Sequence, residues 1–263
     1  MKIILSILII TFIVSCTKAP ITGRNQFILI DTQKELALGA EASVQTITEN
    51  KDKVDIDLQA LAKVQAISSK IANVANKYVT KSGLPDFKWE FHVISDDKTI
   101  NAFCLPGGKI FVYTGIMNIA KNDAQLATVI AHEVAHAIAR HSAERMTTQM
   151  GVNLVSQIGL ASLSGNVSSG NLQLINTAFG IGSGLGVLKH SRSQESESDH
   201  IGIMIMAEAG YDPRESISFW QNMKEATSSK GAEFLSTHPL PETRINDLKK
   251  LSVQAYKIYK ANI

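Results

Sequence analysis

Cysteine, net charge and repeated sequence are all scarce in this chain of 263 residues. Cys16 and Cys104 are its two cysteines. The formal net charge is +2, from 26 basic and 24 acidic side chains, and such a balance argues against nucleic acid as a partner. We find no internal repeat and no low-complexity linker. The length suits one sizeable core, so a single domain is expected.

The N-terminus lacks an apolar run long enough to cross a membrane. Residues 3–14 are apolar apart from one serine and one threonine, which is too short for a stable span and typical of a secretory signal peptide. The Ile-Val-Ser that precedes Cys16 is similar to a bacterial lipoprotein cleavage box. We therefore predict a signal peptide over residues 1–15 and a lipid anchor on Cys16; an ordinary signal peptide is the alternative. Lipidation would exclude a disulfide with Cys104, which we expect to be a small buried side chain.

The pentapeptide HEVAH, at residues 132–136, lies among valine, isoleucine and alanine. His132 and His136 are one helical turn apart, so both imidazoles project from the same face and can bind one Zn²⁺. Glu133 lies beside them, where a carboxylate can act as the general base for a zinc-activated water. The alternative is a buried helix whose histidines are satisfied by hydrogen bonds.

A third metal ligand is predicted in the segment SRSQESESD, residues 191–199. Glu195 and Asp199 are four apart and share one face of a helix, whereas Glu197 points elsewhere. Glu195 would complete a His₂Glu zinc site. Asp199 would accept the outer N–H of a ligating histidine and fix its tautomer. Taken alone, Glu195 could equally be a solvated charge.

Together these two motifs resemble the zinc metallopeptidases related to HtpX and the CAAX prenyl proteases, and more narrowly their periplasmic, BepA-like lipoprotein branch. The resemblance implies an α+β fold: a mainly helical, zincin-like metallopeptidase domain over residues 16–263, with a small β-sheet beside the active-site helix. It also implies one zinc ion per chain, bound by His132, His136 and Glu195. Ser198 stands where the family often has alanine, a mild departure outside the predicted ligands.

The same resemblance implies a function and a location. We expect a zinc-dependent endopeptidase, lipid-anchored on the periplasmic side of the bacterial cell envelope, at the outer membrane. Its substrates would be unfolded or misassembled envelope proteins, and the outer-membrane protein assembly machinery would be a partner. The alternative is a chaperone-like assembly factor with little or no proteolysis. Glu133 favours the enzyme, because a pure binding module does not need a general base.

The remaining patterns place these motifs on secondary structure. Alternating apolar residues predict a half-buried strand over 87–93, and a Pro-Gly-Gly turn divides residues 101–114 into a hairpin. In the resembling family this hairpin runs beside the active-site helix, and its edge can pair with extended substrate; a purely structural hairpin is the alternative. Helices are predicted over 32–49, 56–79, 124–145 and 194–209.

Two further regions bear on activity. Residues 237–244 resemble the His-Pro…Arg segment that follows the zinc helices in this family. His238 would stabilise a developing oxyanion or occupy the fourth zinc position, and Arg244 would orient it or pair with a site carboxylate; a solvated loop histidine is the alternative. His141, five residues beyond His136, is expected to be solvated. The apolar, glycine-rich residues 152–188 predict a buried helical pair, either permanent core or a lid that keeps the enzyme latent.

Overall fold

The computed structural model describes residues 16–150, 190–227, 234–235, 238 and 242–263. Seven helices are bounded within these ranges: α1 Thr32–Glu49, α2 Leu58–Lys81, α3 Thr114–Met117, α4 Asp123–Ile138, α7 Arg192–Glu208, α8 Glu215–Thr227 and α10 Glu242–Ala261. The strands are β1 Cys16–Lys18, β2 Asn25–Phe27, β3 Glu90–Ile94, β4 Ala102–Leu105 and β5 Lys109–Tyr113. The predicted mainly helical α+β fold is confirmed. The predicted helical pair at 152–188 lies outside the described residues.

The larger sheet has three strands in the order β3-β5-β4. The predicted hairpin is confirmed: β4 runs antiparallel to β5, while β3 is parallel to β5. Gly107 and Gly108 form the turn with φ angles of 76° and 84°, where side-chain-bearing residues are strained. A Cβ on Gly108 would also come within 2.4 Å of the Trp89 ring. Within the described chain β4 pairs with β5 alone, so its outer side is a sheet edge.

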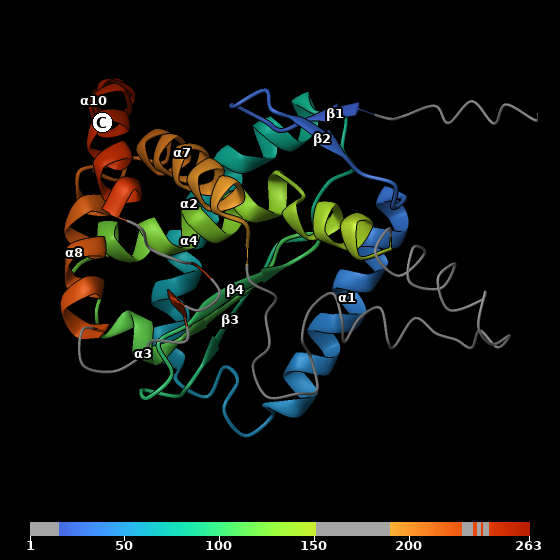
Figure 1. Ribbon diagram of the computed structural model, residues 1–263. Helices are drawn as coiled ribbons and strands as arrows, with labels where there is room; N and C mark the ends of the chain where they lie inside the picture. Colours follow the sequence, from blue (N-terminus) through green and yellow to red (C-terminus); the bar gives the residue numbers. More distant parts are fainter. Residues whose placement is uncertain (1–15, 151–189, 228–233, 236–237, 239–241) are drawn as a thin grey trace, which may run out of the picture.

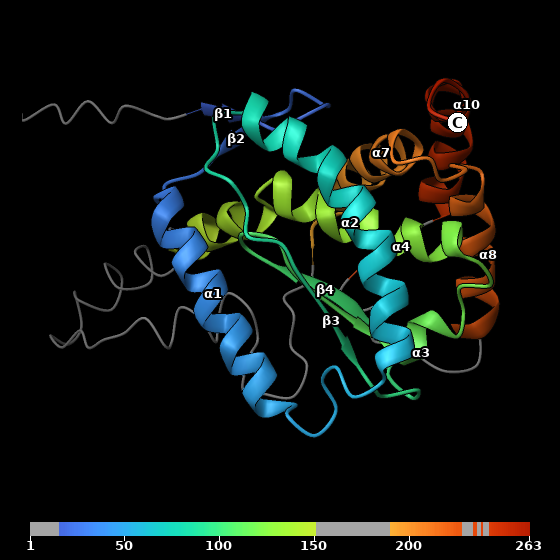
Figure 2. The same cartoon turned by 180° about the vertical axis from the view of Figure 1, so that it is seen from behind.

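Helices cover both faces of this sheet, as alternate residues of β5 demonstrate. Ile110 and Val112 belong to a core cluster shared with α2, α4 and α7. Phe111 and Tyr113 belong to a second cluster, which contains the buried side chains of α1. Accordingly α4 and α1 lie on opposite sides of the strands in Figures 1 and 2. All five residues of β5 are therefore buried.

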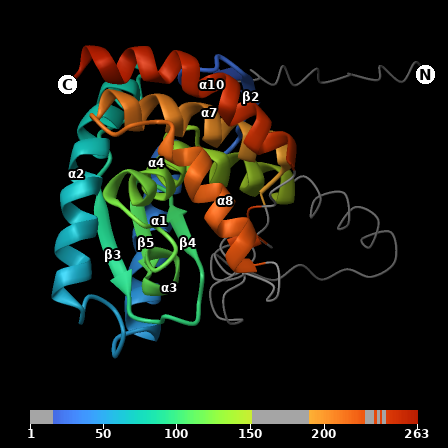
Figure 3. The ribbon, with the colours of Figure 1, turned by 90° about the vertical axis from the view of Figure 1, so that its left-hand side faces the viewer.

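Helix α4 passes through the centre of the molecule (Figure 3). It begins where the Asn122 side chain accepts a hydrogen bond from the Gln125 amide, a cap that satisfies one unpaired N–H of the first turn. Every residue from 125 to 138 is buried, because α2, α7, α8 and the sheet surround the helix. The helix ends before Arg140, whose φ of 52° cannot continue a right-handed helix. The single helix predicted to residue 145 is wrong here: a separate helical segment starts at His141.

Helix α7 is held against α4 at very short range. It starts with a capping box, in which Ser191 and Gln194 bond each other's backbone amides. Two turns further on, a Cβ on Gly202 would lie 3.1 Å from the backbone of Ala131 and His132. A small residue is therefore needed where these helices meet. None of the described helices is both long enough and apolar enough to cross a bilayer.

Candidate metal centre

Helices α4 and α7 bring the three predicted ligands together. The Nε2 atoms of His132 and His136 are 3.1 Å apart. The Glu195 carboxylate lies 3.4 Å from His132 Nε2 and 3.3 Å from His136 Nε2. Donors on one tetrahedral zinc ion at about 2.1 Å are separated by roughly 3.3 Å. The spacing and the N₂O donor set therefore fit zinc, and all three side chains are at least 97% buried, with exposures of 3%, 1% and 0%.

His238 supplies a donor at the fourth corner of this group. Its Nδ1 is 3.3 Å from His132 Nε2 and 3.0 Å from Glu195 Oε1, and the side chain is fully buried. The four residues form one cluster of potential metal ligands. The ring stacks on Phe234 at a centroid distance of 4.4 Å, and the His238 amide donates to the Phe234 carbonyl. His238 is thus held in the centre rather than in solvent.

Glu133 lies one residue from the first ligand and is completely buried. Neither of its carboxylate oxygens has a hydrogen-bond partner among the described residues, which is unusual for a buried charge. His238 Nε2 approaches Glu133 Oε1 to 3.5 Å. Burial raises the pKa of Glu133, which favours a group able to take up and release a proton. The buried thiol of Cys104 also faces this charge: burial raises its pKa, and Glu133 raises it further.

Asp199 and Arg244 support the ligand set from outside. Asp199 Oδ1 lies 3.1 Å from His132 Nδ1, the nitrogen that points away from the other donors. Arg244 is 2.6 Å from Asp199 and 2.7 Å from Glu195, and its guanidinium stacks over Trp220. Burial alone would raise the pKa of Asp199, but the charge and hydrogen bonds of Arg244 together with the contact to His132 hold that pKa below its usual value. Both side chains lie where the sequence motifs predict a carboxylate and its partner.

His141 is not solvated, contrary to expectation. It is fully buried, and its Nδ1 is 2.7 Å from His136 Nδ1. The prediction assumed that α4 continues past His141, but the helix is interrupted at the left-handed residue Arg140, and the His141 side chain contacts His136. His141 Nε2 is 2.9 Å from Glu197. Burial lowers the pKa of His141, although Glu197 opposes this effect.

Sequence reasoning also missed His190 and Arg24. The His190 ring packs on His136 with centroids 3.7 Å apart, immediately before α7. Arg24, in the turn between β1 and β2, forms ion pairs of 2.7 Å with Glu144 and Glu197. Because Arg24 and Glu197 are 173 residues apart in sequence, no local spacing pattern could have paired them. A histidine next to a predicted ligand segment was the available signal for His190.

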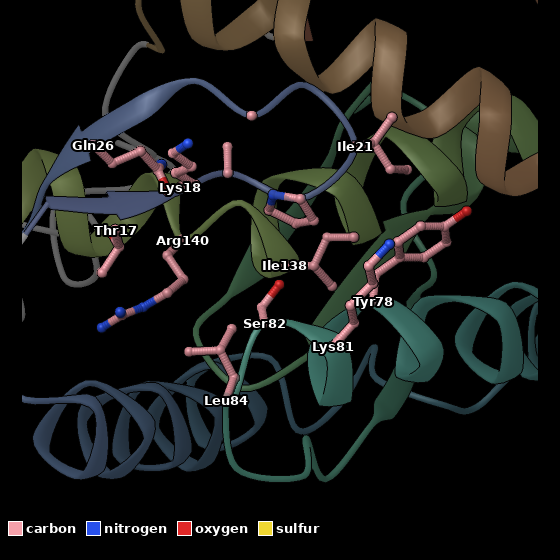
Figure 4. Close-up of a pocket in the computed structure, with 13 residues that line it drawn as sticks. Thr17, Lys18, Ile21, Gln26, Tyr78, Lys81, Ser82, Leu84, Ile138 and Arg140 are labelled. Atoms are coloured by element: carbon pink, nitrogen blue, oxygen red, sulfur yellow. The ribbon is translucent and has the colours of Figure 1, made fainter.

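Among the described residues, one cavity of about 450 Å³ lies between the β1–β2 hairpin and the ends of α2 and α4, away from this centre (Figure 4). It is lined by Lys18, Lys81, Ile138 and Arg140 among others, and by none of the candidate ligands. The cavity recorded against His132 measures only about 10 Å³. The metal centre is therefore closely packed on that side.

A buried His₂Glu cluster on two packed helices, beside an edge strand, defines the class of zinc metallopeptidases. The chain belongs to one family of that class: the profile of peptidase family M48 matches residues 64–252.

Similar proteins include two groups of named proteases. The chain is 35% identical to mitochondrial metalloendopeptidase OMA1 of Schizosaccharomyces pombe, over 88% of this chain and 65% of the relative. It is 32% identical to the human mitochondrial metalloendopeptidase OMA1, over 91% of this chain and 46% of the relative. It is 31% identical to the beta-barrel assembly-enhancing protease of Escherichia coli, over 63% of this chain and 35% of the relative.

These relatives correct two expectations. The predicted zinc metallopeptidase class is confirmed, but the BepA-like branch is not the best fit, since the OMA1 proteins of two yeasts match at 35% identity, against 31% for the E. coli protease, and over more of the chain. The predicted location, on the periplasmic side of a bacterial outer membrane, is wrong: five of the similar proteins are mitochondrial by name. Removal of residues 1–15, lipidation of Cys16 and the single domain over 16–263 stay predictions.

Proposed function

We propose that this protein is a zinc-dependent endopeptidase that hydrolyses peptide bonds in unfolded or misassembled protein chains. The observation that carries the proposal is the group of three buried donors, His132, His136 and Glu195, at separations of 3.1–3.4 Å beside an unpartnered Glu133. The similar proteins support it, because each of those named above is a protease or an endopeptidase.

In this proposal His132, His136 and Glu195 hold the metal, and Glu133 moves the proton. Zinc held there would lower the pKa of water and polarise the scissile carbonyl. Glu133, through a carboxylate oxygen, takes the proton of the attacking water and delivers it to the leaving amide nitrogen. Its unsatisfied oxygens leave it free to accept that proton. Asp199 fixes the tautomer of His132, and Arg244 orients Glu195.

The edge of β4 is the proposed binding surface for substrate. Strand β4 packs along α4, and its outer side is unpaired within the described part of the chain. An extended peptide added to this edge would place its backbone beside the α4 ligands. Pairing through main-chain groups tolerates many sequences, which suits unfolded substrates. The assembly role named for the E. coli relative is a property of that protein and fits the same substrate class.

His238 makes the enzyme latent in this proposal. Its Nδ1 lies at the fourth corner of the ligand group, where substrate or water would have to enter. Displacement of His238 would then be required before hydrolysis.

The decisive experiment compares the zinc-loaded protein with two variants on an unfolded protein substrate. Glu133→Gln should keep one zinc per chain and lose about 10²- to 10⁴-fold in hydrolysis, the typical contribution of a general base. Glu195→Ala should lose zinc itself. Equal cleavage by the wild type and Glu133→Gln would refute Glu133 as the general base. Absence of cleavage by both the zinc-loaded wild type and His238→Ala would refute the enzyme and leave a chaperone-like binding role. Full zinc occupancy in Glu195→Ala would refute the ligand assignment.

A further inference from the structure

His136 makes an outer contact that the proposed mechanism does not use. Its Nε2 faces the other donors, 3.1 Å from His132 Nε2 and 3.3 Å from Glu195. A nitrogen that binds metal uses its lone pair, so the other ring nitrogen carries the hydrogen. His136 Nδ1 therefore donates to His141 Nδ1 at 2.7 Å. His141 must then carry its own hydrogen on Nε2, which donates to Glu197 at 2.9 Å.

The spacing excludes a shared metal ion between these two rings. His136, His141 and His190 do offer three nitrogens within 4.8 Å of one another. However, two nitrogens on one tetrahedral zinc would be about 3.3 Å apart. The observed 2.7 Å is a hydrogen-bond length. Ser198 Oγ, at 3.3 Å from the same His141 nitrogen, is a more distant partner.

Glu197 is in turn fixed by the N-terminal hairpin. The Arg24 guanidinium contacts its Oε2 atom through Nε and through a terminal nitrogen, each at 2.7 Å. The Thr22 hydroxyl donates to the other carboxylate oxygen. The turn that presents these two residues contains Ile21 and Gly23 with φ angles of 64° and 68°. Strands β1 and β2 flank this turn and pair with each other in antiparallel fashion.

The other histidine ligand has the same arrangement around its outer nitrogen. His132 Nδ1 contacts Asp199, and Asp199 is held by Arg244. In both cases the outer nitrogen of the histidine is connected to a carboxylate, and that carboxylate is ion-paired with an arginine. From His136 the connection includes one additional imidazole, that of His141. Its arginine also lies outside residues 64–252, the part matched by the family profile.

We propose that His141, Glu197 and Arg24 form a positioning relay that orients His136 for metal binding, so that the N-terminal hairpin supports the metal site. This inference rests on the ligand set of the proposed function. It assigns His141 and Glu197 as positioning residues that do not touch substrate. Outer partners of this kind typically contribute 10- to 100-fold in metal affinity.

Zinc affinity, measured by competition with a chromophoric chelator, tests the relay without relying on activity. His141→Leu removes the acceptor and should weaken zinc binding by about 10- to 100-fold. His141→Asn keeps an oxygen near the position of Nδ1 and should restore affinity to within a few-fold of the wild type. Glu197→Gln should weaken zinc binding less than His141→Leu. The visible spectrum of the Co²⁺-substituted protein should change in His141→Leu and recover in His141→Asn.

Glu208→Gln is the matched control, because Glu208 lies on α7 as Glu197 does but binds Lys77 and Tyr78. It should keep the zinc affinity and the Co²⁺ spectrum of the wild type. If folded His141→Leu and Glu197→Gln bind zinc as the wild type does, the cluster only fastens the hairpin and the relay is wrong. An equal loss in Glu208→Gln, or a second zinc ion that disappears in His141→Leu, would also overturn it.

The relay and the proposed function fail in different ways. Absence of hydrolysis by both the zinc-loaded wild type and His238→Ala would refute the function while the affinity series still reports on the relay. Should His141→Leu not fold, thermal unfolding will show it, and the folded variants Glu197→Gln and His141→Asn then decide. Unchanged zinc binding in Glu197→Gln would count against the relay in that case.

Discussion

Gly202→Ala should loosen the metal site by separating the two helices that form it. A Cβ at this position would lie 3.1 Å from the backbone of Ala131 and His132, closer than ordinary van der Waals contact. One helix must therefore move by a few tenths of an ångström. Asp199, three residues earlier on the same face of α7, would be drawn away from His132, to which it is now 3.1 Å. Glu195, seven residues earlier, lies on that face as well.

The expected magnitudes follow from this contact. Overpacking costs about 1–3 kcal/mol, and the higher helix propensity of alanine returns about 1 kcal/mol, so the metal-free protein should lose up to about 2 kcal/mol. At about 2–4 °C per kcal/mol, this corresponds to a melting temperature lower by up to about 8 °C. Weakening the His132–Asp199 contact should reduce zinc affinity about 10-fold. The stabilisation gained from excess zinc would then be smaller by about 1.4 kcal/mol.

Thermal unfolding with excess chelator and with excess zinc measures both quantities. Ser196→Ala is the control, because Ser196 is exposed on the same helix and its replacement changes propensity without a new contact. It should leave zinc affinity unchanged. A Gly202→Ala protein that is more stable without metal and binds zinc as tightly as the wild type would refute the close approach of the helices.

Three further predictions concern His238, the ion pair between Glu90 and Lys109, and the contact between α1 and the Pro106 turn. His238→Ala should raise cleavage of unfolded substrate at unchanged zinc content, measured by fluorogenic hydrolysis and metal analysis, because the fourth ligand position becomes open. Burial favours a raised pKa for Glu90, but the hydrogen bond and charge of Lys109, with smaller contributions from His92 and Ser43, lower the pKa below the usual 4.5. The pair therefore stabilises the fold above that value, and the contribution is lost as pH falls. Glu90→Gln should therefore cost at most about 1 kcal/mol at pH 7, since Glu90 is 45% exposed, and almost nothing near pH 3 in urea titrations. Gly39→Ala would place a Cβ 2.2 Å from the Pro106 carbonyl oxygen and should destabilise the protein by about 3 kcal/mol in the same titrations.

For each of these three predictions a specific result would contradict the reasoning. Loss of activity in His238→Ala would contradict latency and point to transition-state stabilisation by that side chain. A cost of Glu90→Gln that persists at pH 3, or that equals the cost of replacing the exposed Glu41, would show that the ion pair is not its origin. Unchanged stability in Gly39→Ala would mean that α1 is not packed on the Pro106 turn.

The proximity of the candidate ligands within each helix was predictable because it depends on helical spacing. One turn separates His132 from His136, and one turn separates Glu195 from Asp199, so each pair shares a face wherever its helix lies. Spacing does not show whether the two pairs lie close together; the resemblance to known metallopeptidases predicted that they do. The same reasoning failed at His141, because a single left-handed residue, Arg140, ended the helix that the pattern had extended.

Contacts between segments that are far apart in the sequence could not be predicted, for a different reason. The Arg24–Glu197 pair joins a three-residue strand region to a helix, and neither residue lies in a periodic pattern. The need for glycine at position 202 also depends on the distance between two helices, which periodicity does not give. Sequence spacing therefore identifies candidate ligands, whereas the residues that hold those side chains in place emerge only from the packed structure.

The charges of the buried centre link the candidate ligands to the stability of the packed structure. Glu133, Glu195 and Asp199 bring three carboxylates into the candidate ligand set and its direct contacts, and Arg244 is ion-paired with two of them. The charge of the buried Arg145 also acts on Glu133 and Glu195. With neutral histidines the carboxylates still outnumber these two guanidinium groups by one, which is unfavourable away from water unless a cation is bound. A bound dication would offset this excess, so zinc is expected to stabilise the fold as well as to enable the chemistry.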